Sequence, residues 1–366
     1  MAPGASGAQE TVVSAPDALS GPSQAPVLVT GAAGFIGSSV VESLLRSGVN
    51  RVRCLVRPSS SRSRGEDLAR SFPGARLEFV EGNVLSREDC ARAAAGVAVV
   101  YHLAAGIGKS YAGCYLTSVV GTRNLLDAVS DAGGVRRFVN VSSLAVYSNI
   151  HMRRHALLDE TCDIDTRCLE RHEPYAYAKL KQDELVIDHA ARRNLSCAIV
   201  RPGAVYGRGK PDLTARVGID TFGLFLHLGG SNRIPLTYVD NCADAIVLAG
   251  TADGADGQVF NVIDDELPTS RQFIRGYTRH VGPLRRLWVP YRAFHLFCHA
   301  WEMYAAKSGG QLPPVFNRRR CSVYWKGNRY SNQKLKERLG WTPRVSTADG
   351  LARYFAYLKG LQQTSC

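Results

Sequence analysis

The sequence predicts an α/β protein: a doubly wound parallel sheet with helices on both faces, followed by a smaller C-terminal domain. Short apolar runs alternate with amphipathic, helix-length stretches over the first 200 residues, a pattern typical of a parallel sheet. The runs at 97–103 and 138–141 are almost continuously apolar, as strands buried on both faces usually are. A glycine-rich turn directly follows the first run.

Apart from its first residues, the chain has the composition of a folded protein. It contains 366 residues, of which 45% are hydrophobic, enough for a main domain and a smaller partner. Residues 1–25 are rich in Ala, Gly, Ser and Pro, which predicts a disordered tail. We find neither a secretory leader nor an apolar stretch of membrane-spanning length, so the expected location is cytoplasmic.

Charge and cysteine usage exclude some classes of function. The ten cysteines form no C-x-x-C pair and have no metal-ligand spacing with His, so we expect reduced, mostly buried thiols and no metal site. The net charge of +13 is concentrated at places such as 51–64 and 318–320. An anionic ligand or a charged membrane surface would fit it, but no nucleic-acid motif accompanies it, so no nucleic-acid partner is expected.

The apolar runs define the expected domains. Strands are predicted at 26–30, 52–56, 77–80, 97–103, 138–141 and 197–200. They give a dinucleotide-binding domain over 26–200 and a mainly substrate-binding domain over 201–366, with 238–262 returning to the main sheet.

The glycine turn indicates what the main domain binds. Gly31, Gly34 and Gly37 lie between the first strand and a helix that opens at Phe35 and Ile36. Glycines at this spacing permit a tight turn and close approach of a phosphate, and the helix N-terminus supplies free N–H groups. In this strand–turn–helix context the motif predicts a nicotinamide dinucleotide.

The end of the second strand bears on the choice of cofactor. An acidic residue there would bind the adenosine ribose hydroxyls, but the chain has Val56 and Arg57. Arg57 could pair with a 2′-phosphate, so NADP is preferred over NAD; a solvated basic loop is the alternative. Further cofactor contacts are expected after the third and fourth strands, at Asn83, Val84, Leu103, Ala104 and Ala105.

The stretch PYAYAK at 174–179 suggests proton chemistry. Helical spacing places Tyr175 and Lys179 on one face, with Tyr177 elsewhere. A neighbouring ammonium is expected to lower the pKa of the Tyr175 phenol and suit it to proton transfer. The same spacing also occurs by chance on helix surfaces.

Together these motifs resemble the extended branch of the short-chain dehydrogenase/reductase superfamily, which has a Rossmann-type fold and includes sugar-nucleotide epimerases and dehydratases and 3β-hydroxysteroid dehydrogenases. The resemblance spans about residues 26–360. It rests on TGAAGFIG at 30–37, GNV at 82–84, HLAA at 102–105, VSSLAVY at 141–147, YAYAK at 175–179 and RPGAVYG at 201–207.

The resemblance implies roles for individual residues. Tyr175 would be the catalytic acid or base, and Lys179 its partner, which also holds the nicotinamide ribose. Ser143 would hydrogen-bond the reacting oxygen, and Pro202 would lie against the cofactor. Hydride transfer at a secondary alcohol or ketone needs such a proton donor, a group that steadies the alkoxide, and a positioned nicotinamide.

Departures from the family pattern narrow the prediction. Asn83 replaces a common Asp, and Ser118 replaces a frequent Asn. Sugar-nucleotide 4,6-dehydratases carry an Asp-Glu pair after the catalytic hydroxyl, where this chain has Leu144 and Ala145. Dehydration of that type is therefore disfavoured.

The substrate is left between two classes. The sequence of residues 238–243 resembles that of the steroid dehydrogenases and reductases of the family. An aromatic stripe over 288–304 fits an apolar substrate pocket, a peripheral membrane contact or ordinary packing. The alternative class is a sugar nucleotide, whose diphosphate would pair with arginines of the C-terminal part. These arginines could equally be solvated surface residues. These arginines are Arg208, Arg216, Arg233 and Arg318 to Arg320.

The predicted function is therefore an NAD(P)-dependent oxidoreductase acting on a bulky or hydrophobic small-molecule substrate. An NAD-dependent sugar-nucleotide epimerase and a non-catalytic, cofactor-binding regulatory protein are the alternatives. By analogy with the family, a homodimer would pair through helices around 116–132 and 175–193.

Overall fold

The computed structural model describes residues 25–221, 223–309 and 311–364. The predicted tail at 1–25 lies outside them except for its last residue. A seven-stranded sheet forms the larger part of the molecule, in the order β12-β7-β5-β4-β1-β2-β3, and every pairing within it is parallel. Its strands are β1 (Val27–Thr30), β2 (Arg51–Val56), β3 (Arg76–Glu81), β4 (Val99–His102), β5 (Arg137–Val141), β7 (Cys197–Pro202) and β12 (Gln258–Val262).

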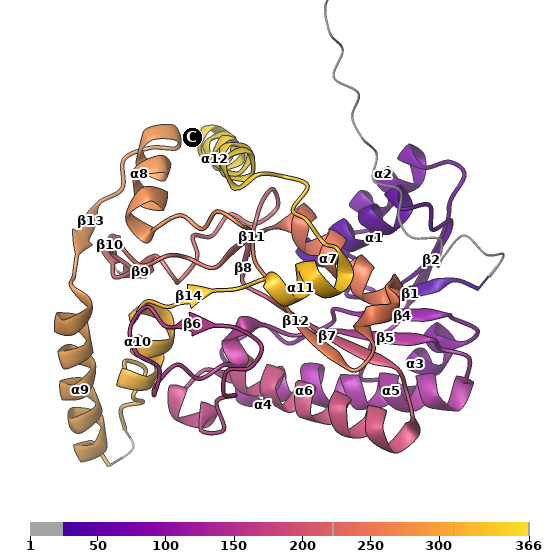
Figure 1. The fold of residues 1–366 in the computed structure, drawn as a ribbon, viewed down its shortest axis with the longest axis horizontal. Coiled ribbons are helices and arrows are strands. Elements are labelled where there is room, and N and C mark those ends of the chain that lie inside the picture. The colour runs from indigo at the N-terminus through magenta and orange to yellow at the C-terminus, as the bar shows by residue number, and fades with distance from the viewer. Residues whose placement is uncertain (1–24, 222, 310, 365–366) are drawn as a thin grey trace, which may run out of the picture.

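Helices cover both faces of this sheet, so the predicted fold class is confirmed (Figure 1). The strands β1, β4 and β7 are wholly buried because they pack against helices above and below, whereas the edge strand β3 is only partly buried. One layer contains α1 (Phe35–Arg46), α2 (Ser63–Ser71), α7 (Val239–Thr251) and α11 (Gln333–Leu339). The other contains α3 (Arg87–Ala94), α4 (Tyr111–Tyr115), α5 (Gly121–Ala132) and α6 (Pro174–Arg193).

The sheet order reverses between β1 and β4, since the chain first runs outward to β3 and then returns to β4 on the other side of β1. At such a point the connections leave in opposite directions, which opens a crevice at the carboxyl ends of the strands. The glycine turn follows β1 and the segment 103–107 follows β4, so both lie at this crevice.

The remaining elements form a smaller part beside these strand ends (Figure 1). Two hydrophobic clusters hold it together, one between α8, α12 and β10, and one between α9 and α10. The division of the chain at residue 200 stays a prediction. The elements are β8 (Ala204–Tyr206), β11 (Leu236–Tyr238), β9 (Gly218–Thr221), β10 (Leu224–His227), β13 (Arg286–Trp288), β6 (Leu157–Leu158), β14 (Arg329–Tyr330), α8 (Ser270–His280), α9 (Tyr291–Lys307), α10 (Arg318–Trp325) and α12 (Thr347–Thr364).

Candidate active site

A cavity of about 660 Å³ opens at the carboxyl ends of the central strands. Its walls combine the glycine turn, the segment after β5, the start of α6 and the segment 202–216. Most of the predicted site residues meet here although they are spread over 170 positions of sequence. Those that line it are Gly31, Gly34, Phe35, Ile36, Gly37, Leu103, Ala105, Ser143, Tyr175, Lys179 and Pro202.

Four predicted cofactor contacts lie outside this lining: Arg57, Asn83, Val84 and Ala104. Arg57 is exposed at the end of β2, where the sequence places it. The Asn83 side-chain oxygen accepts from the Leu85 amide at 3.0 Å, and Val84 is buried in the hydrophobic cluster beneath the crevice. Their cofactor roles stay predictions.

Glycine is required in the turn because the backbone has no room for a side chain. Gly31 has a φ of 69°, and a Cβ there would lie 3.0 Å from the Ala104 amide nitrogen. A Cβ on Gly37 would lie 2.0 Å from the Gly31 carbonyl oxygen. The N-terminus of α1 lines this cavity and has no side-chain cap, so its N–H groups would be available to a pyrophosphate.

Ser143 and Tyr175 face each other across this cavity. Ser143 precedes the short 3₁₀ helix Leu144–Val146, where its hydroxyl accepts from the Ala145 amide at 3.1 Å. The same hydroxyl lies near enough to the Tyr175 phenol to lower its pKa. Because the Ser143 oxygen already accepts from a backbone amide, its proton is free to donate to the phenol or to a substrate oxygen.

The pKa of Tyr175 differs from the expectation drawn from the PYAYAK spacing. Burial raises the pKa of Tyr175 and outweighs the lowering by the nearby Ser143 hydroxyl; the Asp183 carboxylate raises it further. The expected lowering was wrong because the desolvation of a phenolate was not visible in the sequence. A phenol with a raised pKa stays protonated at neutral pH, which suits it to act as a proton donor.

The Lys179 ammonium is held by groups other than the phenol. It donates to the Val141 carbonyl at 2.6 Å and to the Gln182 side-chain oxygen at 2.8 Å. Burial lowers the pKa of Lys179 to about 8, although the Asp183 carboxylate opposes this change. The side chain thus reaches the end of β5 beneath the cavity, with its position set by two fixed acceptors.

A buried chain of hydrogen bonds continues from Lys179 to the first strand. Gln182 donates to Thr122 at 2.8 Å, Thr122 meets the His102 Nε2 at 2.8 Å, and His102 Nδ1 meets Thr30 at 2.7 Å. Burial lowers the pKa of His102 to about 3, so the ring is neutral and contributes one donor and one acceptor. The sequence analysis missed this chain.

Asp183 is a second residue that the sequence analysis missed, although it lies one helical turn after Lys179. Its carboxylate accepts from Asn140 at 3.0 Å, from Ser142 at 2.9 Å and from Arg201 at 3.1 Å. It is therefore a buried counterion that ties α6 to β5 and β7. The spacing i, i+4 from the lysine is the one signal in the sequence that could have indicated it.

The start of α6 is fixed by a buried ion-pair cluster. Arg171, with no exposed surface, donates to Glu173 at 2.8 Å and to the Ala145 carbonyl at 2.5 Å, and lies 3.7 Å from Asp165. Glu173 directly precedes α6, so Arg171 connects the segment that carries Ser143 to the helix that carries Tyr175.

Five of the six arginines considered for a diphosphate have partners within the protein. Arg318 pairs with Glu302 at 2.6 Å, Arg319 with Asp165 at 2.9 Å and Arg320 with Glu173 at 3.3 Å. Arg216 donates to the Val323 carbonyl and lies over the Tyr324 ring, and Arg233 donates to the Leu267 carbonyl. Arg208 is exposed.

Fold and site together fit a dinucleotide-dependent enzyme: the glycine turn could bind a pyrophosphate, and a Ser, a Tyr and a Lys line the same cavity. The model of the NAD-dependent epimerase/dehydratase family matches residues 27–262, and the chain belongs to this family. It is an NAD(P)-dependent enzyme of the extended short-chain dehydrogenase/reductase type, as the sequence motifs predicted.

Among curated proteins, the chain is similar to a 3-beta-hydroxysteroid dehydrogenase of Mycolicibacterium neoaurum, with 28% identity over 92% of each chain. It is 24% identical to the mouse sterol-4-alpha-carboxylate 3-dehydrogenase, decarboxylating, over 89% of this chain and 88% of that one. The solved UDP-glucuronic acid 4-epimerase of Bacillus cereus, in complex with NAD, shares the fold with a TM-score of 0.69 at 22% identity, over 92% of this chain and 98% of that one.

Within the described ranges, no group of three or more His, Cys, Asp or Glu side chains is arranged to hold a metal ion. No helix in the same ranges is long and apolar enough to cross a membrane.

The lowered pKa of Lys179 predicts a pH dependence. The ammonium keeps its charge below about pH 8 and loses it above, so kcat/KM for the cofactor should fall as the pH rises through about 8. Tyr175 would not produce this change, because its pKa is raised from an ordinary value of about 10. The measurement is the pH profile of kcat/KM in wild type and in Lys179→Arg, whose guanidinium stays charged. If kcat/KM of the Lys179→Arg variant falls over the same pH range, the titrating group is not Lys179.

Proposed function

We propose that this protein is an NAD(P)-dependent oxidoreductase that transfers a hydride at a secondary alcohol or ketone, with Ser143, Tyr175 and Lys179 as its catalytic set. The observation that carries the proposal is that Ser143, Tyr175 and Lys179 line one cavity together with the glycine turn. When bound, a nicotinamide cofactor would supply or accept the hydride.

The chain's own residues account for the proton side of the reaction. In the direction of ketone reduction, the Tyr175 phenol gives its proton to the carbonyl oxygen while Ser143 donates a hydrogen bond to the same oxygen. The Lys179 ammonium, fixed by Val141 and Gln182, supports the phenolate that remains. Alcohol oxidation uses the same groups in reverse.

The substrate is proposed to be bulky and hydrophobic, such as a sterol-like hydroxy or keto compound. Beyond the catalytic set, aromatic and aliphatic side chains line the cavity, among them Phe273, Tyr324, Tyr354 and Leu213. Of the two cations that line the cavity beyond Lys179, Lys210 is exposed, and the Arg216 guanidinium is already engaged by Val323 and Tyr324. Two relatives aligned over most of the chain are named for steroid or sterol substrates.

An NAD-dependent sugar-nucleotide epimerase is the alternative, because its chemistry would use the same catalytic set and the solved epimerase shares this fold. The internal pairing of Arg318, Arg319 and Arg320 counts against it, because a diphosphate would have to compete with the carboxylates. Retention of the catalytic set counts against a non-catalytic regulatory protein.

The cofactor state of the purified protein tests the oxidoreductase against the epimerase. An oxidoreductase must exchange its cofactor in each turnover, so we expect an empty site that binds added cofactor reversibly. Adding reduced cofactor and a hydrophobic ketone should then consume both in equal amounts. NAD that stays bound through purification, together with a redox-neutral reaction, would establish the epimerase instead.

NADP is proposed as the preferred cofactor because Arg57 stands at the end of β2 without an ion pair in the described part of the chain. Its neighbours are engaged: Arg62 pairs with Glu81 and Arg64 lies 3.7 Å from Glu42. Arg57→Ala should weaken NADPH binding about tenfold and leave NADH binding within about twofold, as expected for one charge-assisted contact to a phosphate. Titration of both cofactors measures this.

Arg76→Ala is the control for that titration, since Arg76 is exposed at the start of β3, at the opposite end of the strands from the crevice. Equal affinities of the Arg57 variant and wild type for NADPH would overturn the preference.

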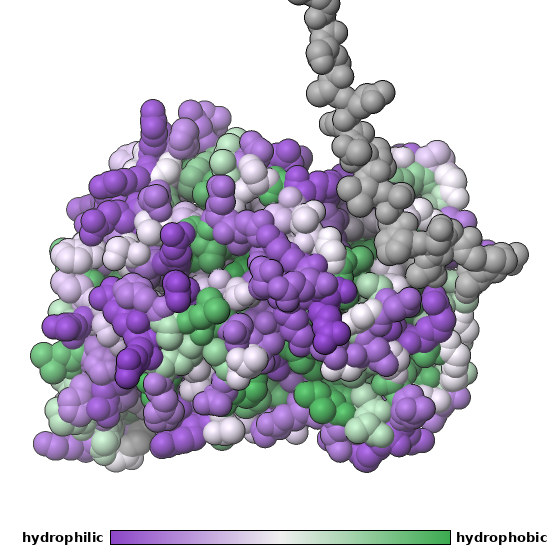
Figure 2. All heavy atoms as spheres, in the orientation of Figure 1, coloured by the Kyte–Doolittle hydropathy of each residue, from purple (hydrophilic) through white to green (hydrophobic). Residues whose placement is uncertain are grey.

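The proposals about partners and location are less specific. Peripheral membrane contact through 288–304 is favoured by the exposed Leu296, Phe297, Met303 and Tyr304 on α9. Hydrophobic and hydrophilic residues are mixed over the face drawn in Figure 2, which includes this edge. A homodimer through α5 and α6 and a cytoplasmic location also remain proposals. Vesicle co-sedimentation tests the membrane contact, the mass in solution tests the homodimer, and cell fractionation tests the location.

A further inference from the structure

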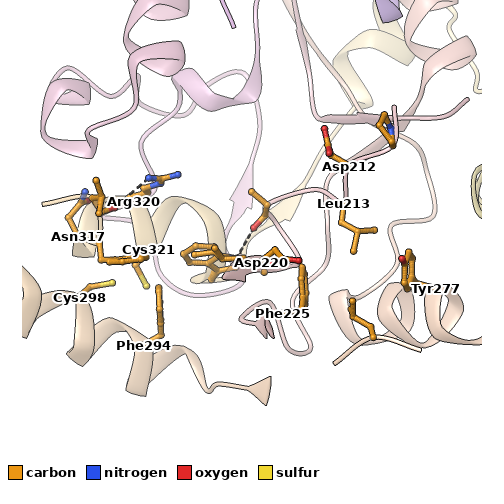
Figure 3. A pocket seen from close by; sticks show the side chains of 18 residues that line it. Asp212, Leu213, Asp220, Phe225, Tyr277, Phe294, Cys298, Asn317, Arg320 and Cys321 are labelled. Atoms are coloured by element: carbon orange, nitrogen blue, oxygen red, sulfur yellow. Dashed lines mark hydrogen bonds between the residues drawn. The ribbon is translucent and has the colours of Figure 1, made fainter. Parts of the chain in front are cut away.

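A second cavity, of about 630 Å³, lies in the smaller part of the molecule (Figure 3). It opens between the two hydrophobic clusters that hold this part together. Phe225 and Tyr277 belong to one wall, and Phe294, Cys298 and Trp325 to the other. The catalytic chemistry described above uses none of these side chains.

This second cavity adjoins the catalytic one. The segment 211–215 separates them, because Pro211, Asp212, Leu213 and Ala215 line both. The segment is neither helix nor strand. Trp325 donates to the Ala215 carbonyl at 3.0 Å and Tyr354 to the Asp212 carbonyl at 3.0 Å. A molecule that enters along the segment would touch both cavities.

The lining indicates what the second cavity would bind. Apart from Asp212, Asp220, Asn317 and Arg320, its described side chains are apolar, aromatic or sulfur-containing, with one phenol. Arg320 is the cation among them, and it is paired with Glu173 at 3.3 Å. A phosphate would therefore find no unpaired cation here, whereas an apolar group would remove hydrophobic walls from water.

We propose that this second cavity binds the apolar body of an elongated substrate whose secondary alcohol or ketone lies at Tyr175. The inference rests on the proposed function. It adds the location of the apolar part of the substrate and the feature that selects substrates by length. The catalytic cavity alone would accept the reacting ring, and the second cavity would select for molecules long enough to pass the segment 211–215.

The test fills the second cavity without touching the catalytic one. Val315 lines the second cavity alone and is 38% exposed, so Val315→Trp should fold and obstruct it. Leu224→Trp is the matched control, because Leu224 is also 38% exposed but lines neither cavity. The substrates are dehydroepiandrosterone, which carries a secondary alcohol on a fused-ring body, and cyclohexanol, which carries it on one ring.

Val315→Trp should lower kcat/KM for the steroid at least about tenfold and change that for cyclohexanol by less than about twofold. Leu224→Trp should change neither. Equal effects of Val315→Trp on both substrates, or none on the steroid, would overturn the inference.

A binding measurement separates this inference from the proposed function. The fluorescence anisotropy of dehydroergosterol should report binding to wild type and to Tyr175→Phe alike, and binding about tenfold weaker to Val315→Trp. Unchanged affinity of Val315→Trp for dehydroergosterol, or no binding to wild type, would refute binding in the second cavity. Binding as expected without turnover of either alcohol would leave the site in place and refute the proposed oxidoreductase.

Discussion

Replacing Tyr175 by Phe should reduce hydride transfer by about a thousandfold and leave cofactor binding nearly unchanged. The variant removes one hydroxyl, and with it the proton donor that meets Ser143 in the cavity. General acid–base catalysis contributes about 10²- to 10⁴-fold, whereas the glycine turn that would bind the pyrophosphate is untouched. The measurements are kcat under saturating substrate and the dissociation constant of the cofactor.

Tyr177→Phe is the matched control for this prediction. Tyr177 lies two residues further along α6, and its ring packs against Tyr111 and Tyr115 with centroids 5.9 and 6.4 Å away. It is not among the residues that line the cavity, so removal of its hydroxyl should leave kcat within about twofold of wild type. Activity of the Tyr175 variant equal to that of the Tyr177 variant would refute the assignment of the acid.

Replacing Arg171 by Leu should lower the free energy of unfolding by about 3 kcal/mol. Arg171 is fully buried and is held by Glu173, Asp165 and the Ala145 carbonyl. Breaking a buried ion pair by removing one partner costs about 3–5 kcal/mol, because the other charge stays buried without compensation. The lower end applies here, since Arg319 and Arg320 still face the two carboxylates. Urea denaturation measures the change.

Arg167→Leu serves as the comparison in the same segment. Arg167 pairs with Glu170 at 2.6 Å, but the two side chains are 67% and 48% exposed, and an exposed pair contributes at most about 1 kcal/mol. A similar loss of stability in both variants would show that burial of the Arg171 pair is unimportant. The Arg171 variant should also lose activity, because the residue connects the Ser143 segment to the start of α6.

Local sequence patterns predicted much of this protein. The strand–turn–helix order around Gly31 and Gly37 indicated the dinucleotide crevice, because the close approach of Gly37 to the Gly31 carbonyl acts between residues only six positions apart. The spacing of Tyr175 and Lys179 put both on one face of a helix for the same reason. Nearly continuous apolar runs located the buried parallel strands.

Only the tertiary structure decided how the charged and polar groups are used. The sequence allowed Arg318 to Arg320 to be diphosphate ligands, but packing brings them to Glu302, Asp165 and Glu173. It likewise directs Lys179 towards Val141 and Gln182, and burial raises the pKa of Tyr175 instead of lowering it.

One physical reason separates the features that the sequence predicted from those that only the tertiary structure decided. Helix, strand and turn preferences are set by neighbours along the chain, so a sequence displays them directly. The partner of a buried charge, the desolvation of a phenol and the shape of a second cavity depend on segments far apart in the sequence, such as Asp165 and Arg319, which are separated by 154 residues. The sequence by itself therefore determined the fold class, the cofactor crevice and the candidate catalytic residues, and folding decided their electrostatic surroundings and the room left for a substrate.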